Sequence, residues 1–182
     1  MTTFCHIGMG RLGIAVANAM MLLQKGNTHA FFEPLPEARQ KLQAGEYAEM
    51  EMVACATGNK VLYFQIIPRN CEVYIVTAGK PRTSPKQDKT DLLNENLAIL
   101  EPLIERIPDG ATVWIATNPP VELADFFGAR PLRSCTDDLR KAVWGEDWKE
   151  ANDRMLAAKG YTSYGPAVAM AKEVLLCLEP AR

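Results

Sequence analysis

The chain has 182 residues, 48% of them hydrophobic, which is enough for one sizeable domain with its own core. A formal net charge of −2 argues against a nucleic-acid-binding surface and against attraction to an anionic membrane. No apolar run comes near the roughly 20 residues of a membrane span, and no signal-peptide pattern is present, so we expect a cytoplasmic protein. The five cysteines are scattered without a CxxC pair, which favours reduced thiols, and with only two histidines we expect no metal site.

The first predicted strand leads into a glycine-rich turn, Phe4-Cys-His-Ile-Gly-Met-Gly-Arg-Leu-Gly13. Each glycine has a separate task in binding a dinucleotide. Gly8 permits the sharp strand-to-helix turn, Gly10 lets the backbone approach a pyrophosphate, and Gly13 lets the helix pack close to the sheet. The turn therefore predicts a dinucleotide-binding site, with an ordinary βαβ unit as the alternative.

A helix predicted over residues 11–25 follows the turn, and a second strand containing Phe31-Phe32 comes after it. Arg11 and Leu12 lie at the helix N-terminus, where N–H groups and the positive end of the helix dipole face a phosphate. Glu33 stands 20 positions after the last glycine. A carboxylate there accepts hydrogen bonds from a ribose diol and repels a 2′-phosphate, so we expect NAD rather than NADP.

In the middle of the chain, predicted helices alternate with predicted strands. A short helix is predicted over residues 36–44, and Gly58-Asn59 predicts a hairpin between two segments, 52–57 and 61–67. Buried strands are predicted at 72–77 and 112–117, with a helix over 90–106 between them. Pro102 should kink or shorten that helix, whose apolar face is predicted to contain Leu93, Leu97, Leu100 and Ile104.

This alternation predicts an α/β fold, a Rossmann-type doubly wound parallel sheet with right-handed crossovers. Residues 128–135 are expected to be irregular, and helices are predicted over 137–146, 147–158 and 164–178. We therefore divide the chain into a dinucleotide-binding domain, residues 1–127, and a helical C-terminal extension, residues 128–182. The C-terminal helices should pack on or beside the sheet.

Several segments together resemble the lactate/malate dehydrogenase family. They are Ile7-Gly-Met-Gly-Arg-Leu-Gly13, Val76-Thr-Ala-Gly-Lys-Pro-Arg82 continuing to Asp91-Leu-Leu-Asn-Glu-Asn96, Ala116-Thr-Asn-Pro119 and Lys159-Gly-Tyr-Thr-Ser-Tyr164. The resemblance covers residues 1–124 and then about 148–178. It implies an NAD cofactor, with further cofactor contacts from Thr77, Ala78, Gly79 and Asn118.

The chain lacks two segments that carry the chemistry in that family. Neither the Gly-x-His-Gly type segment with the catalytic histidine nor the aspartate three residues before a substrate-binding arginine has a counterpart. His6 and His29 belong to strands and match neither. The chain is therefore interpreted as a truncated member that keeps the cofactor domain and the C-terminal helix. In the family the helix after the second strand and this last helix form much of the main dimer interface, which implies a homodimer through 36–44 and 157–178. The alternative is that Val168, Ala171 and Leu175 only cover the sheet of their own protomer.

The resemblance also implies a partial substrate site. Arg82 matches an arginine that contacts the substrate's second carboxylate, Thr162 matches a residue of the substrate pocket, and Asn118 matches an asparagine that orients the substrate oxygen. Lys89 stands near the place of a second loop arginine, but an ammonium lacks the planar fork of a guanidinium.

The proton donor is the open question. Tyr164 and Tyr161 are candidates if the Lys159 ammonium lowers the pKa of a phenol, and plain packing of these tyrosines is the alternative. Water, or an imine substrate that is already protonated, could replace a side-chain donor. We expect an NAD-dependent oxidoreductase acting on a small carboxylate-bearing carbonyl or imine. The alternative is a catalytically inactive NAD(H)-binding sensor or partner subunit.

Overall fold

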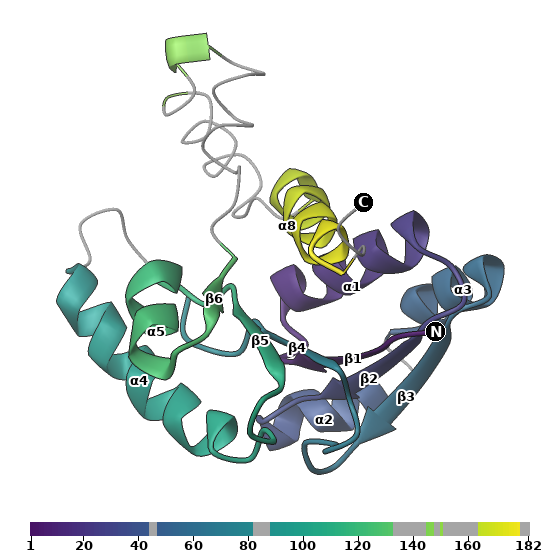
Figure 1. Cartoon of the computed structure of the whole chain (residues 1–182), viewed down its shortest axis with the longest axis horizontal. Coiled ribbons are helices and arrows are strands. Elements are labelled where there is room, and N and C mark those ends of the chain that lie inside the picture. Colours follow the sequence, from purple (N-terminus) through teal and green to yellow (C-terminus); the bar gives the residue numbers. More distant parts are fainter. Residues whose placement is uncertain (44–46, 82–87, 133–144, 148–149, 151–163, 179–182) are drawn as a thin grey trace.

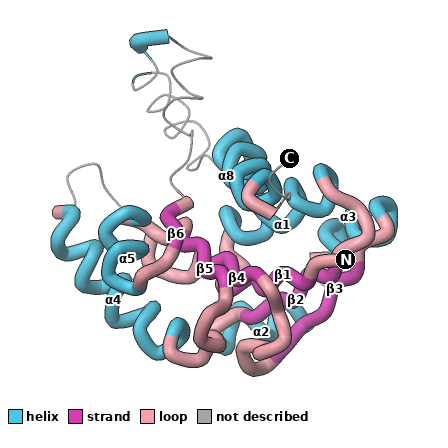
Figure 2. The backbone as a smooth tube through the Cα atoms, viewed as in Figure 1, coloured by secondary structure: helices cyan, strands magenta, loops and turns pink. Residues whose placement is uncertain are grey.

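A computed structural model describes residues 1–43, 47–81, 88–132, 145–147, 150 and 164–178. Its centre is a six-stranded, wholly parallel sheet in the order β3-β2-β1-β4-β5-β6, with helices on both sides (Figures 1 and 2). The strands are β1 (Thr3–Ile7), β2 (Thr28–Phe32), β3 (Lys60–Phe64), β4 (Val73–Val76), β5 (Thr112–Ile115) and β6 (Arg130–Pro131). This is the predicted Rossmann-type doubly wound sheet.

The helices are α1 (Arg11–Leu23), α2 (Pro36–Gln43), α3 (Ala48–Thr57), α4 (Lys89–Ile104), α5 (Pro120–Phe127) and α8 (Tyr164–Leu176), with a 3-10 turn at Gly145–Asp147. Within the described ranges, no helix is both long and apolar enough to cross a membrane. The helices predicted over 137–146 and 147–158 lie largely outside these ranges.

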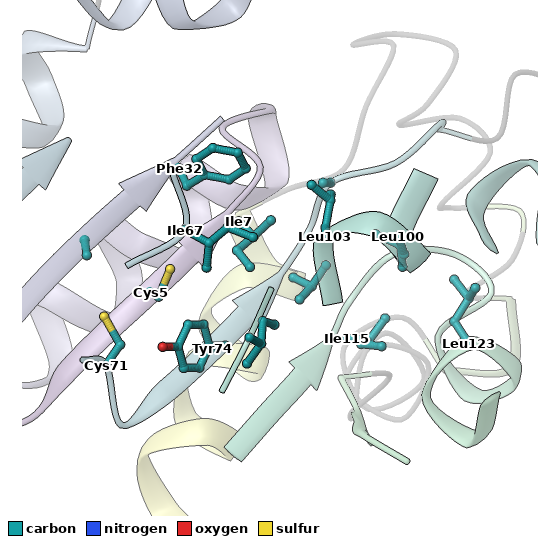
Figure 3. Packing of buried hydrophobic residues seen from close by; sticks show 14 of the residues in the cluster. Cys5, Ile7, Phe32, Ile67, Cys71, Tyr74, Leu100, Leu103, Ile115 and Leu123 are labelled. Atoms are coloured by element: carbon teal, nitrogen blue, oxygen red, sulfur yellow. The ribbon is translucent and has the colours of Figure 1, made fainter. Parts of the chain in front are cut away.

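The two faces of the sheet have separate cores because successive side chains of a strand point to opposite sides. On one face Phe4, Val73 and Ile75 pack against α1 and α8. On the other face Cys5 and Ile7 join Tyr74, Ile115 and residues of α4 and α5 (Figure 3). The predicted C-terminal helix is thus present as α8, and it packs against α1 beside the sheet (Figure 1).

The predicted hairpin around Gly58-Asn59 is wrong. Residues 48–57 form α3, and β3 runs parallel to β2. Gly58 is the left-handed C-cap of α3, with a φ of 70°, and its N–H faces the carbonyls of Ala54 and Cys55. A glycine with a positive φ can end a helix or form a hairpin turn. Here the helix-forming residues before Gly58 favour the helix end.

Three smaller expectations also change. Residues 130–131, within a segment expected to be irregular, add β6 beside β5. The most deeply buried side chains of α4 are Leu92, Asn96, Leu100 and Leu103, so the buried face is rotated from the predicted one. Pro102 lies in the last turn, and α4 ends at Ile104, somewhat earlier than predicted.

Candidate functional site

The strand order reverses direction between β1 and β4. From β1 the chain proceeds to β2 and β3 on one side, and from β4 it proceeds to β5 and β6 on the other. The connections therefore diverge at the carboxyl ends of β1 and β4 and leave a crevice there, the usual ligand site of an open α/β sheet. The glycine turn after β1 lies at this point.

The glycine turn is packed against the end of β4. Gly8 has a φ of 100°, a conformation that suits glycine, and a Cβ there would collide with the Ala78 backbone. A Cβ on Gly13 would overlap the Gly8 carbonyl oxygen. The Thr77 hydroxyl donates to that same carbonyl at 2.9 Å. Gly8 and Gly13 are thus required by the close packing of the turn.

Gly10 differs from these two glycines. Its φ of −69° suits any L residue, and a Cβ there would have no atom within 4 Å. It is also the N-cap of α1, and having no side chain it cannot accept from the first-turn N–H groups. Arg11 and Leu12 form that first turn, with Leu12 partly buried against α8 and its neighbours. The open side of the turn is therefore at Gly10.

Glu33 lies at the end of β2 with its side chain only 4% exposed. One carboxylate oxygen accepts from the Met9 N–H at 2.5 Å and the other from the Leu35 N–H at 2.9 Å. The carboxylate is therefore fixed beside the glycine turn by the backbone itself. Each oxygen keeps a further lone pair for a hydroxyl group.

The loops after β4 and β5 are joined by Asn96, a fully buried residue of α4. Its Oδ1 accepts from the Lys80 N–H at 2.7 Å, and its Nδ2 donates to the carbonyls of Lys80 and Asn118 at 3.2 and 2.6 Å. The Thr117 hydroxyl adds a bond to the Ala78 carbonyl at 2.5 Å. A Cβ on Gly79, whose φ is 144°, would collide with Thr117.

Sequence reasoning missed the role of Asn96. The signal was present, because an asparagine stands on the apolar face of a helix between Leu92 and Leu100. Its partners lie 16 and 22 residues away in sequence, so no local pattern identifies them.

The proposed substrate residues are placed only in part. The Asn118 side chain is exposed at the carboxyl end of β5, and its backbone carbonyl carries the bond to Asn96. Lys89 and Tyr164 are the first residues of α4 and α8, and their side chains lie outside what the structure describes. Arg82 and Thr162 lie outside the described residues altogether.

Both histidines of the chain are buried, His6 on β1 and His29 on β2. His6 Nε2 and His29 Nδ1 are 2.9 Å apart, and the two rings stack between Phe4 and Phe31. Burial lowers the pKa of His29 to about 4, and burial together with the neighbouring ring lowers that of His6 well below its usual value. The pair is therefore neutral at pH 7.

Comparison with solved structures identifies the architecture. The chain superposes on malate dehydrogenase from Archaeoglobus fulgidus in complex with NADH, with a TM-score of 0.72 and 18% identity, over 97% of this chain and 78% of that one. The fold is that of the malate and lactate dehydrogenases. A minor L-lactate dehydrogenase from Enterococcus mundtii gives a TM-score of 0.65 at 15% identity, over 95% of this chain and 76% of that one.

Malate dehydrogenase from Salinibacter ruber gives a TM-score of 0.64 at 16% identity, over 96% of this chain and 75% of that one. No family model and no curated protein sequence matches the chain. The likeness is thus one of fold, and the functional argument depends on the residues at the crevice.

Proposed function

We propose that the chain binds NAD(H) at the carboxyl ends of β1, β2 and β4. The observation that carries the proposal is the contrast within the glycine turn: Gly8 and Gly13 are enclosed, whereas Gly10 is open at the start of α1. An open backbone at a helix N-terminus, with no first-turn carboxylate, suits a pyrophosphate. The backbone of Arg11 and Leu12 would contact the phosphates.

Glu33 favours NAD(H) over its phosphorylated form. Its fixed, buried carboxylate has lone pairs for the two hydroxyls of a ribose, and its charge opposes a 2′-phosphate. Thr77, Ala78 and Gly79, on the β4 side of the crevice, would complete the binding surface.

We further propose an oxidoreductase activity on a small carbonyl or imine that bears a carboxylate. The bound nicotinamide would supply or accept a hydride. Asn118 would orient the substrate oxygen or nitrogen, since its side chain is exposed while its backbone carbonyl is held by Asn96. Arg82 and Lys89 would neutralise the substrate carboxylate, Thr162 would line the pocket, and Tyr164 is the candidate proton donor.

One observation favours the second candidate, an NAD(H)-binding sensor or partner subunit without catalysis. Both histidines of the chain are buried against each other with lowered pKa values, so neither can exchange a proton with a substrate at the crevice. An enzyme would then depend on another proton donor.

We also propose a homodimer through residues 36–44 and 157–178. Exposed apolar side chains of α8 support it, since Leu176 is 66% exposed and Val168 is 42% exposed. Sedimentation equilibrium should give twice the mass of one chain, and a Leu176→Glu variant should shift the equilibrium toward the monomer.

The binding proposal is tested by titrating the purified protein with NADH, followed by nucleotide fluorescence. We expect saturable binding, much weaker binding of NADPH, and a loss of about 10- to 100-fold for Glu33→Gln because a charge-assisted hydrogen bond is removed. Glu72→Gln is the matched control, because Glu72 also accepts from a backbone N–H but at the opposite end of the sheet. No saturable binding of either nucleotide would overturn the proposal.

Catalysis is tested by following NADH oxidation with small 2-oxo acids, with and without ammonium. The enzyme hypothesis expects turnover that Asn118→Ala reduces at least tenfold, and by a larger factor than any loss of NADH affinity, since Asn118 is also an implied cofactor contact. Tight NADH binding without turnover on any such acid would support the sensor instead.

A further inference from the structure

Two cysteines far apart in the sequence lie together in the core that faces α4 and α5. Cys5 is in the middle of β1, and Cys71 precedes β4 by two residues. Both are buried free thiols of the same cluster. The proposed nucleotide site uses neither of them, because Cys5 lies in the middle of β1 and Cys71 before the amino end of β4, whereas the glycine turn follows the carboxyl end of β1.

The backbone explains why the two thiols meet. Cys5 and Tyr74 are register partners in the parallel pair of β1 and β4, so their side chains point to the same face. The Tyr74 hydroxyl donates to the Pro68 carbonyl at 2.8 Å, which holds the segment before β4 over that face. Figure 3 shows the sulfur atoms of Cys5 and Cys71 on the same side of the Tyr74 ring.

The two thiols differ in access and in acidity. Cys71 is 8% exposed, whereas Cys5 is fully buried. Interaction with the Cys5 side chain lowers the pKa of Cys71, while interaction with Cys71 and burial raise the pKa of Cys5. Because the thiolate is the nucleophile in disulfide exchange, Cys71 would react first with an incoming oxidant.

We propose that Cys5 and Cys71 are an oxidisable dithiol that closes to an intramolecular disulfide when a low-molecular-weight disulfide reaches Cys71. The Cys71 thiolate attacks one sulfur of the reagent, forms a mixed disulfide and releases one thiolate. The Cys5 thiol then loses its proton to solvent or to the released thiolate and attacks the Cys71 sulfur, which releases the second thiolate. The protein loses two electrons and two protons, and the reagent is reduced to two thiols.

The new bond would tie the segment before β4 to the centre of β1. It closes a loop of more than 60 residues, so it restricts the unfolded chain and raises the unfolding temperature. A rise on the order of 5–10 °C is expected for a chain of this size. The nucleotide affinity should change little because the bond lies away from the glycine turn.

The experiment exposes the whole protein to glutathione disulfide, followed by non-reducing tryptic peptide mapping. Trypsin releases Cys5 in peptide 1–11 and Cys71 in peptide 70–82, each with no other cysteine. We expect these two peptides cross-linked, with a mass two hydrogens below their sum, and the reduced peptides again after dithiothreitol. Cys55 and Cys177 are exposed and serve as internal controls that should carry glutathione.

Variants separate the two steps. In Cys71→Ser the Cys5 peptide should remain a free thiol, and in Cys5→Ala the Cys71 peptide should retain glutathione because nothing displaces it. Cys55→Ser should leave the cross-link intact. If Cys5→Ala does not fold, the wild type and Cys71→Ser still decide the matter. The proposal is overturned if wild-type Cys71 stays free, or keeps glutathione, after Cys55 and Cys177 have reacted completely.

Discussion

Gly10 differs from the other two glycines of the turn, because its lack of a side chain matters for ligand binding rather than for folding. The glycines on either side of it are enclosed by the backbone of β4 and of the turn itself, so a side chain there would disturb the fold. At Gly10 the backbone has ordinary angles and open space. The packing of the turn does not require a glycine here, whereas close approach of a pyrophosphate to the backbone would.

We therefore expect Gly10→Ala to fold normally and to bind NADH at least tenfold more weakly, because the added methyl occupies the approach of the pyrophosphate. Thermal unfolding and NADH titration of the same preparation measure the two properties. Gly8→Ala is the contrasting variant and should be strongly destabilised, since its φ and the Ala78 backbone both exclude a Cβ. An unchanged NADH affinity in Gly10→Ala would contradict the assigned role.

Asn96 connects helix α4 to the two loops that form one side of the crevice. It occupies a position on the buried, apolar face of α4, and its side chain forms hydrogen bonds with three backbone groups. Backbone polar groups without a partner in such a place are costly, so these loops depend on the helix for their conformation.

Replacing Asn96 with leucine should lower the free energy of unfolding by about 2–4 kcal/mol, because the Lys80 and Asn118 groups lose their partners without gaining water. Urea denaturation gives the value. Asn94→Ala, an exposed change on the same helix, is the matched control and should cost under about 1 kcal/mol. Equal effects of the two substitutions would mean that Asn96 does not hold the loops.

The elements that the sequence predicted well are those with strong local patterns. The apolar runs of β1, β4 and β5 predict buried strands, the glycine turn predicts a strand-to-helix connection under either interpretation, and alternation with helices then specifies a parallel sheet. Gly58 is compatible with both a helix C-cap and a hairpin turn because both favour a positive φ, so the local sequence does not distinguish them. The role of Asn96 depends on contacts between distant segments, which no local pattern encodes.

In the molecule as a whole, the groups that face the crevice and the buried thiol and histidine pairs occupy different places on the sheet. The carboxyl ends carry the open backbone of Gly10, the buried carboxylate of Glu33 and the exposed Asn118 side chain, while the thiol pair and the histidine pair are buried against the faces of the sheet. The histidine pair gives the molecule a pH dependence that is independent of any ligand.

Within this pair, one ring nitrogen donates to the other, and the two remaining nitrogens, His6 Nδ1 and His29 Nε2, are buried with no hydrogen-bond partner among the described residues. A proton added to either ring in the folded protein would place a charge in an apolar stack. The unfolded chain has no such restriction, and its histidines titrate near pH 6.5.

Stability should therefore fall as the pH drops below about 6.5. Above this pH both rings are neutral in both states and contribute no pH dependence. Below it the unfolded chain binds protons that the folded chain excludes, down to the lowered pKa of His29 at about 4, so acid favours unfolding. Between pH 7.5 and pH 5, His29 alone accounts for a loss of about 2 kcal/mol, and His6 adds to it in the same direction.

Urea denaturation of the wild type and of a His6→Gln/His29→Gln double variant at these two pH values measures the effect. These are the only histidines in the chain, so other titrating groups are common to both proteins and cancel in the comparison. The double variant should be less stable than the wild type at pH 7.5, because the ring stacking is lost, yet it should lose at least 2 kcal/mol less on going to pH 5. Parallel losses in the two proteins would show that the histidine pair does not cause the acid sensitivity.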